Sequence, residues 1–128
     1  MLYADTSALT KLIIDERESD ALRAYLLNRE PLVSSSLVTT ELIRTVRRVR
    51  PDREPQARTL LEETDLILMG AEVLARAATF DPPELRSLDA IHLASALSLG
   101  SDLEGILTYD SRMRSAALAM GLAVLSPD

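Results

Sequence analysis

Four carboxylates occupy positions in this sequence from which they could act on one substrate. Asp5 and Asp110 each follow a short apolar run directly and precede a helical pattern. In a parallel sheet the strand ends converge on one edge, where α/β proteins bind their ligands. Glu41 lies in a helix expected to leave a strand at this edge. Asp89 joins the group if its own helix also begins there, which the sequence leaves open.

The chemistry available to such a cluster is hydrolysis at a phosphate. Neighbouring carboxylates repel one another unless a cation is present. The chain has no cysteine and one histidine, so the ligands would be oxygen atoms, which suit Mg²⁺ or Mn²⁺. A divalent ion held in this way can activate water and bind phosphoryl oxygens. We therefore expect phosphodiester hydrolysis if the four carboxylates meet.

Each of these carboxylates also has a simpler interpretation. Asp5 and Asp110 could cap the helices that follow them, and Asp89 could only offset a helix dipole. Glu41 shares a helix face with apolar residues, and a buried charge needs a partner, so we expect it to be ion-paired or a ligand. His92 is more often a core residue with a hydrogen bond than a general base.

Short apolar runs alternate with helical patterns along the whole chain. Strands are predicted at residues 2–4, 31–34, 65–69, 105–108 and 122–125, and 65–69 is expected to be the most clearly buried. One helix is predicted directly after the first strand and Asp5, and a second one ends at about residue 28. Further helices are predicted at 37–50, 55–61, 70–79, 87–99 and 111–120. This alternation predicts an α/β protein. We expect a three-layer α/β/α sandwich around a central, mostly parallel five-stranded sheet, with residues 1–128 forming one domain.

The helix that carries Asp89 has a clear start signal and an apolar face. Ser87 is the expected N-cap, after a Pro-Pro pair that blocks helix formation. Leu88, Ile91, Ala94 and Leu97 recur at helical spacing, which predicts that this face packs into the core.

Composition limits the range of possible functions. The chain has 14 basic and 20 acidic residues, a net charge of −6, which argues against binding nucleic acid by bulk attraction. The arginines between Arg44 and Arg58 are expected to form a solvated, ion-paired surface rather than an RNA contact. The amino terminus lacks signal-peptide features, and no apolar run approaches the ~20 residues of a membrane span. These features predict a cytoplasmic protein without membrane contact.

Several short motifs, in this order, resemble the PIN-domain ribonucleases, and most closely the VapC-type toxins of toxin–antitoxin pairs. The motifs are Asp5-Thr6-Ser7, Glu41 after a serine-rich turn, Leu88-Asp89-Ala90-Ile91-His92-Leu93-Ala94, and Thr108-Tyr109-Asp110 followed by Ala116-Ala117 and Gly121. Each motif is weak alone, but the ordered set covers essentially the whole chain.

The resemblance implies a metal-dependent endoribonuclease with Mg²⁺, or Mn²⁺ as a substitute. The family's catalytic, metal-binding acids correspond to Asp5, Glu41, Asp89 and Asp110. A metal-activated water would attack the RNA phosphate and leave a 5′-phosphate. Supporting hydroxyls correspond to Thr6 and Ser7, and Thr108 is either strand filler or a further hydroxyl of the site. The resemblance also implies a homodimer and a VapB-type antitoxin partner.

Three other functions are less consistent with the sequence. A phospho-accepting receiver domain needs a lysine after its last strand, whereas the single lysine is Lys11. A catalytically inactive PIN-like binding module would not need all four carboxylates. A structure-specific DNA nuclease would need additional helices, which a chain of 128 residues does not provide.

Overall fold

The centre of the fold is a sheet of five short strands that all run parallel, in the order β3-β2-β1-β4-β5. The computed structural model describes all 128 residues. The strands, in chain order, are β1 (Leu2–Ala4), β2 (Val33–Ser35), β3 (Asp65–Ile67), β4 (Gly105–Leu107) and β5 (Val124–Leu125).

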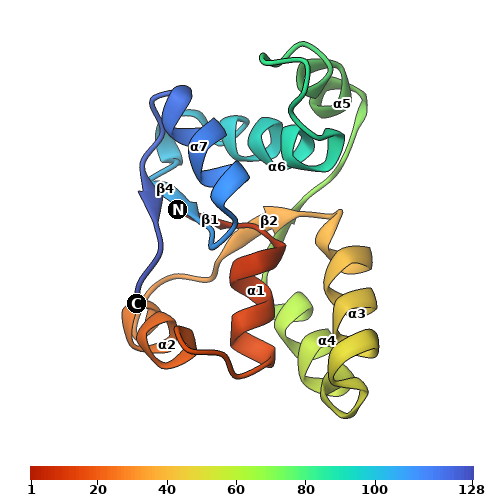
Figure 1. Cartoon of the computed structure of the whole chain (residues 1–128), viewed down its shortest axis with the longest axis vertical. Helices are drawn as coiled ribbons and strands as arrows, with labels where there is room; N and C mark the ends of the chain where they lie inside the picture. Colours follow the sequence, from red (N-terminus) through yellow and green to blue (C-terminus); the bar gives the residue numbers. More distant parts are fainter.

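Seven α-helices form two layers, with α1 to α4 on one side of the sheet and α5 to α7 on the other (Figure 1). The helices are α1 (Thr6–Ile13), α2 (Ser19–Leu26), α3 (Val38–Val49), α4 (Glu54–Glu63), α5 (Ala71–Ala77), α6 (Ser87–Leu97) and α7 (Ser111–Ala119). The predicted three-layer α/β/α sandwich is confirmed. None of these helices combines the length and apolar character that crossing a membrane requires.

The central strand β1 separates two hydrophobic cores. Leu2 and Ala4 pack into the core beneath α1 to α4, whereas Tyr3 packs into the core formed with α6 and α7. Successive side chains of a strand point to opposite faces, so one short strand contributes to both layers. All three residues are buried, which explains why the strand is apolar throughout.

The strand order places a topological switch point between β1 and β4. From β1 the chain moves outward to β2 and β3, then returns to place β4 on the other side of β1. The connections on the two sides therefore leave in opposite directions, and α/β sheets tend to bind ligands at the carboxyl ends of strands at such a point. Asp5 follows β1, and Thr108 follows β4, at this switch point.

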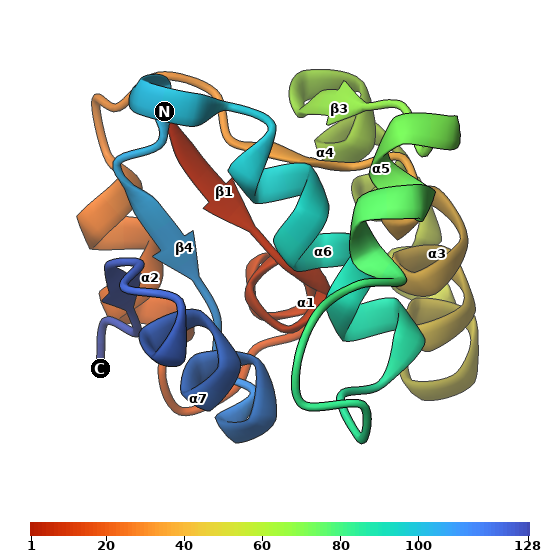
Figure 2. The same cartoon turned by 90° about the horizontal axis from the view of Figure 1, so that it is seen from above.

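The surroundings of α6 differ from the sequence prediction. The predicted core residue Leu88 is 48% exposed, whereas Ala90, Leu93, Ala94 and Ala96 are buried. The helix lies between α5 and the sheet (Figure 2), so it is covered on two sides and its buried surface is wider than one apolar stripe.

Two other local predictions also need correction. Arg86, not Ser87, occupies the N-cap position of α6, and no side chain caps this helix. The segment predicted as the clearest buried strand ends at Ile67 and forms the edge strand β3, with Leu68 78% exposed. An apolar run cannot by itself distinguish a central strand from an edge strand, because the difference depends on the strand order.

We expect Leu93→Ala to lower the free energy of unfolding by about 2–5 kcal/mol, because it leaves a cavity between α6 and the sheet. Urea denaturation followed by circular dichroism measures this change. Leu88→Ala, on the same helix but half exposed, is the matched control and is expected to cost less than about 1 kcal/mol. Equal losses of stability for both variants would contradict the burial of Leu93 between α6 and the sheet.

Candidate active site

Asp5 lies at the end of β1, where its carboxylate is buried and receives three hydrogen bonds. Asp5 has extended backbone geometry and caps α1, with Oδ1 accepting from the amide of Ala8 at 3.1 Å. Oδ1 also accepts from the Ser7 hydroxyl at 2.6 Å, and Oδ2 accepts from the Thr108 hydroxyl. The capping interpretation is therefore correct for Asp5, but it accounts for only one of the three bonds.

Ser7 and Thr108 connect the carboxylate of Asp5 to the loop that follows β4. The Ser7 hydroxyl accepts from the amide of Tyr109 at 2.8 Å, and the Thr108 hydroxyl accepts from the amide of Asp110 at 3.1 Å. Each hydroxyl thus accepts from this loop and donates to Asp5. Thr108 is fully buried, and its hydroxyl holds the Asp5 carboxylate and the loop after β4, so it is more than strand filler.

Glu41 lies in the first turn of α3 and is held by two partners. Its Oε1 accepts from the Thr6 hydroxyl at 2.6 Å and from Nε2 of His92 at 2.8 Å. Its Oε2 accepts no hydrogen bond from the chain. The expectation that Glu41 needs a partner is confirmed, and one carboxylate oxygen remains available to a ligand.

His92 is buried on α6 and connects Glu41 to the central strand. Because a carboxylate only accepts, Nε2 must carry a proton, and in the neutral imidazole Nδ1 is then an acceptor. The Tyr3 hydroxyl lies 2.7 Å from Nδ1. Burial raises the pKa of Tyr3, which keeps the hydroxyl protonated and able to donate. The interpretation of His92 as a hydrogen-bonded core residue is confirmed.

Asp89 and Asp110 make different contacts. Asp110 caps α7, with Oδ1 accepting from the amides of Arg112 and Met113 while Oδ2 accepts none. Asp89 is partly buried in the first turn of α6 and accepts no hydrogen bond. Both side chains therefore keep oxygen atoms free.

Burial, hydrogen bonds and neighbouring charges shift the pKa values of three of the four acids. Burial raises the pKa of Asp5, and this effect outweighs its hydrogen bonds from Ser7 and Thr108. Burial also raises the pKa of Asp89. The negative charges of Asp110 and Asp5 add to the increase, whereas His92 and Arg86 partly oppose it. In Glu41, by contrast, the hydrogen bonds from His92 and Thr6 outweigh burial and lower the pKa.

The donor set fits Mg²⁺ as a partly hydrated ion rather than as a fully enclosed one. No group of three or more Asp, Glu or His side chains lies close enough to hold a metal ion by itself. Mg²⁺ usually keeps several waters and needs only one or two carboxylates. Free oxygens on Asp89, Asp110 and Glu41, together with the raised pKa of Asp89, are consistent with that requirement.

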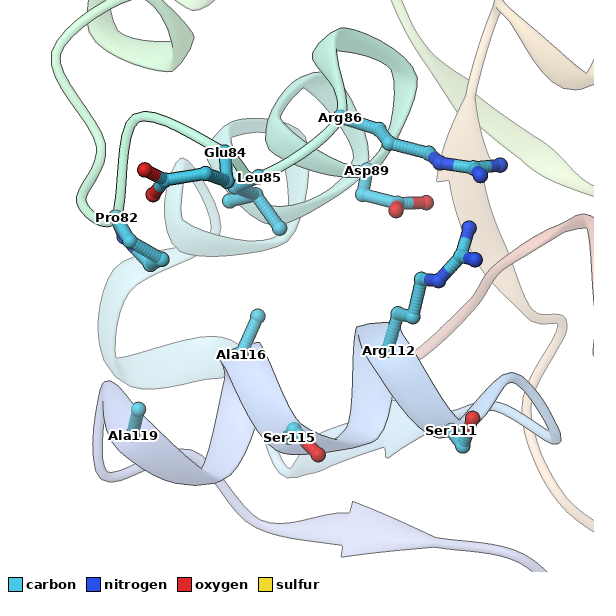
Figure 3. A pocket seen from close by; sticks show the side chains of 10 residues that line it. All are labelled: Pro82, Glu84, Leu85, Arg86, Asp89, Ser111, Arg112, Ser115, Ala116 and Ala119. Atoms are coloured by element: carbon cyan, nitrogen blue, oxygen red, sulfur yellow. The ribbon is translucent and has the colours of Figure 1, made fainter.

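A cavity of about 610 Å³ lies between the start of α6 and α7, and Asp89 contributes to its wall (Figure 3). Asp5, Glu41 and Asp110 do not line it. Arg86 and Arg112 extend from the two helices toward the carboxylate of Asp89. Sequence reasoning missed both arginines, since they belong to no basic cluster, although each lies within three residues of a predicted site acid.

The basic stretch from Arg44 to Arg58 is largely ion-paired. Arg50 pairs with Asp52, and both Arg47 and Arg58 pair with Glu54. The favoured interpretation of this stretch as an ion-paired surface is confirmed.

Comparisons with known proteins agree with this fold and identify its family. The PIN domain family matches residues 2–118. Ribonuclease VapC46 of Mycobacterium tuberculosis is 46% identical over 126 residues, covering 98% of this chain and 97% of that protein. A toxin–antitoxin complex from Klebsiella pneumoniae has a TM-score of 0.76 at 19% identity, covering 100% of this chain and 98% of that chain.

A second solved structure shares the fold across its full length. VapC20 of Mycobacterium tuberculosis, described as a sarcin-ricin loop cleaving toxin, has a TM-score of 0.74 at 16% identity and covers 99% of this chain and 100% of that chain. The fold, the match of the family to residues 2–118 and the 46% identity to VapC46 agree. The chain belongs to the PIN-domain family and, within it, to the VapC ribonucleases.

Proposed function

We propose that this chain is a Mg²⁺-dependent endoribonuclease and the toxin of a VapBC-type pair. The observation that carries the proposal is the placement of Asp5 and Asp110 after β1 and β4, where the Thr108 hydroxyl bonds both to the Asp5 carboxylate and to the Asp110 amide. Asp89, in the first turn of α6, lies near enough for the charges of both to raise its pKa. Their shared negative charge is not balanced by an ion pair within the chain, since none of the three forms a salt bridge. A cation at this edge would remove that imbalance.

The ligands of the Mg²⁺ would come from Asp5, Asp89, Asp110 and Glu41, with one or two of these carboxylates binding the ion directly and the others contacting its waters. Mn²⁺ could replace it because it accepts the same oxygen ligands. When bound, the ion would make a coordinated water more acidic and offset charge on the phosphate oxygens. Ser7 and Thr108 fix the orientation of Asp5. Thr6 and His92 fix Oε1 of Glu41 and keep this carboxylate ionised, with Oε2 free to accept.

The comparisons also support the proposed substrate and partner. VapC46 is named a ribonuclease, which supports RNA as the substrate class, and VapC20 is described as a sarcin-ricin loop cleaving toxin. The Klebsiella structure is a toxin–antitoxin complex, which supports a VapB-type antitoxin as the partner. The family resemblance of the motifs further supports a homodimer that acts in the cytoplasm.

Asp5→Asn and Asp89→Asn are each expected to lower RNA cleavage by about a hundredfold or more, because each removes a charge from the metal-binding edge. Cleavage of total RNA with Mg²⁺, followed on a denaturing gel, measures the loss. Asp65→Asn is the matched control, since Asp65 begins β3 at the opposite edge of the sheet. Cleavage at the normal rate by both site variants would refute the proposed function.

Mg²⁺ is expected to stabilise the folded protein, by about 2.7 kcal/mol at a hundredfold excess over its Kd. Thermal unfolding with and without a chelator measures this change. Asp89→Asn should remove much of the gain and also stabilise the metal-free protein, because the raised pKa of Asp89 marks a carboxylate that is costly to ionise. The same Mg²⁺ response in the variant and the wild-type protein would place the ion elsewhere.

Tyr3→Phe is expected to lower kcat severalfold and leave KM unchanged, because the hydroxyl orients His92 and thereby Glu41 but lies away from any substrate. The lost hydrogen bond should cost about 1 kcal/mol of stability. Tyr25→Phe is the control, since the Tyr25 hydroxyl has no hydrogen bond within the chain. Steady-state cleavage kinetics separate kcat from KM, and an unchanged kcat would remove Tyr3 from the positioning network.

A further inference from the structure

We propose that the cavity between α6 and α7 binds a nucleotide of the RNA next to the cleaved bond, with Arg86 and Arg112 holding its phosphate. This inference rests on the proposed ribonuclease function and names a substrate subsite for it. The cavity reaches from Asp89 at one end to Ala119 at the other, along α7.

The two arginines lack the carboxylate partners that most other basic residues in the chain have. Neither Arg86 nor Arg112 forms a salt bridge, whereas Arg47, Arg50 and Arg58 are all paired. Both guanidinium groups extend toward Asp89 (Figure 3), yet neither lies within the 4.0 Å of an ion pair. Two cations that approach an acid without pairing with it are available to an anion.

Charge balance explains why an RNA-cleaving site on this chain needs such cations. The chain carries a net charge of −6, and the acids at the switch point add local repulsion against a phosphodiester. Arginine offers planar N–H donors that match two phosphate oxygens at once. Arg86 immediately precedes α6, Arg112 lies in the first turn of α7, and both extend toward Asp89, so they can contact one phosphate from two sides.

The rest of the cavity suits a sugar and a base without selecting a sequence. Its volume of about 610 Å³ is within the ordinary range of small-ligand sites. Leu85 points into it from the α6 side, and Ala116 and Ala119 form part of the α7 wall. No aromatic side chain lines it, so it offers apolar contact but no stacking platform. We therefore expect this subsite to bind the backbone and any base.

RNA binding without cleavage tests the subsite directly. The probe is a fluorescein-labelled single-stranded RNA of mixed sequence and about ten nucleotides, mixed with Asp5→Asn protein in a chelating buffer so that the RNA stays intact. Asp5 does not line the cavity, so this background retains every side chain of the subsite. Fluorescence anisotropy at several salt concentrations gives the Kd and its salt dependence.

Arg86→Ala and Arg112→Ala are each expected to weaken RNA binding about tenfold. Each should also reduce the slope of log K against log salt concentration by about 0.7, because one contact to a single-strand phosphate contributes about that much. Arg114→Ala is the matched control, since it removes the same charge from the same helix. Arg114 contacts Ser126 and does not line the cavity. Its Kd and slope should stay close to those of the background protein.

The outcomes separate the subsite from the proposed function. Binding that is unchanged in both cavity variants, or weakened equally in Arg114→Ala, overturns the subsite even if the wild-type protein cleaves RNA. Loss of binding in the cavity variants alone supports the subsite, even if no cleavage is found and the ribonuclease proposal fails. In cleavage assays of the wild-type background, the same variants should raise KM more than they lower kcat.

Discussion

A buried carboxylate held by two hydroxyls connects the two strands on which the site depends. Asp5 follows β1, and its hydrogen bonds from Ser7 and Thr108 reach the loop after β4. An ionised group in the interior is costly unless donors surround it, so these hydroxyls make the charge tolerable. They also fix the positions of the two strand ends, because each hydroxyl accepts from a backbone amide of that loop.

The remaining charges of the site are incompletely compensated. Asp89 accepts no hydrogen bond, and Arg86 and Arg112 extend toward it without forming an ion pair. Elsewhere most basic residues are paired, as between Arg50 and Asp52. Proteins tend to violate local rules of charge pairing at functional sites, where a ligand completes the interactions. Glu41 differs, since Thr6 and His92 satisfy one of its oxygens within the chain.

The incorrect predictions share one physical cause. Leu88 has the spacing of a core residue and is half exposed, and the apolar segment around Leu68 forms an edge strand whose end is exposed. In both cases the spacing of apolar residues indicates which side chains a segment can bury. It does not indicate which neighbouring elements are present to cover them. The same limit applies to Ser87, whose type suits a cap although the chain places Arg86 at that position.

Sequence alone determined the alternation of strands and helices and the placement of Asp5 and Asp110 after strands, because periodicity and strand-end position are local properties. Only the tertiary structure decided how the acids are partnered. The bond between Tyr3 and His92 joins residues 89 positions apart, and the bond between Thr108 and Asp5 spans 103 positions. Such contacts follow from the strand order and the packing of α6, which no local pattern encodes.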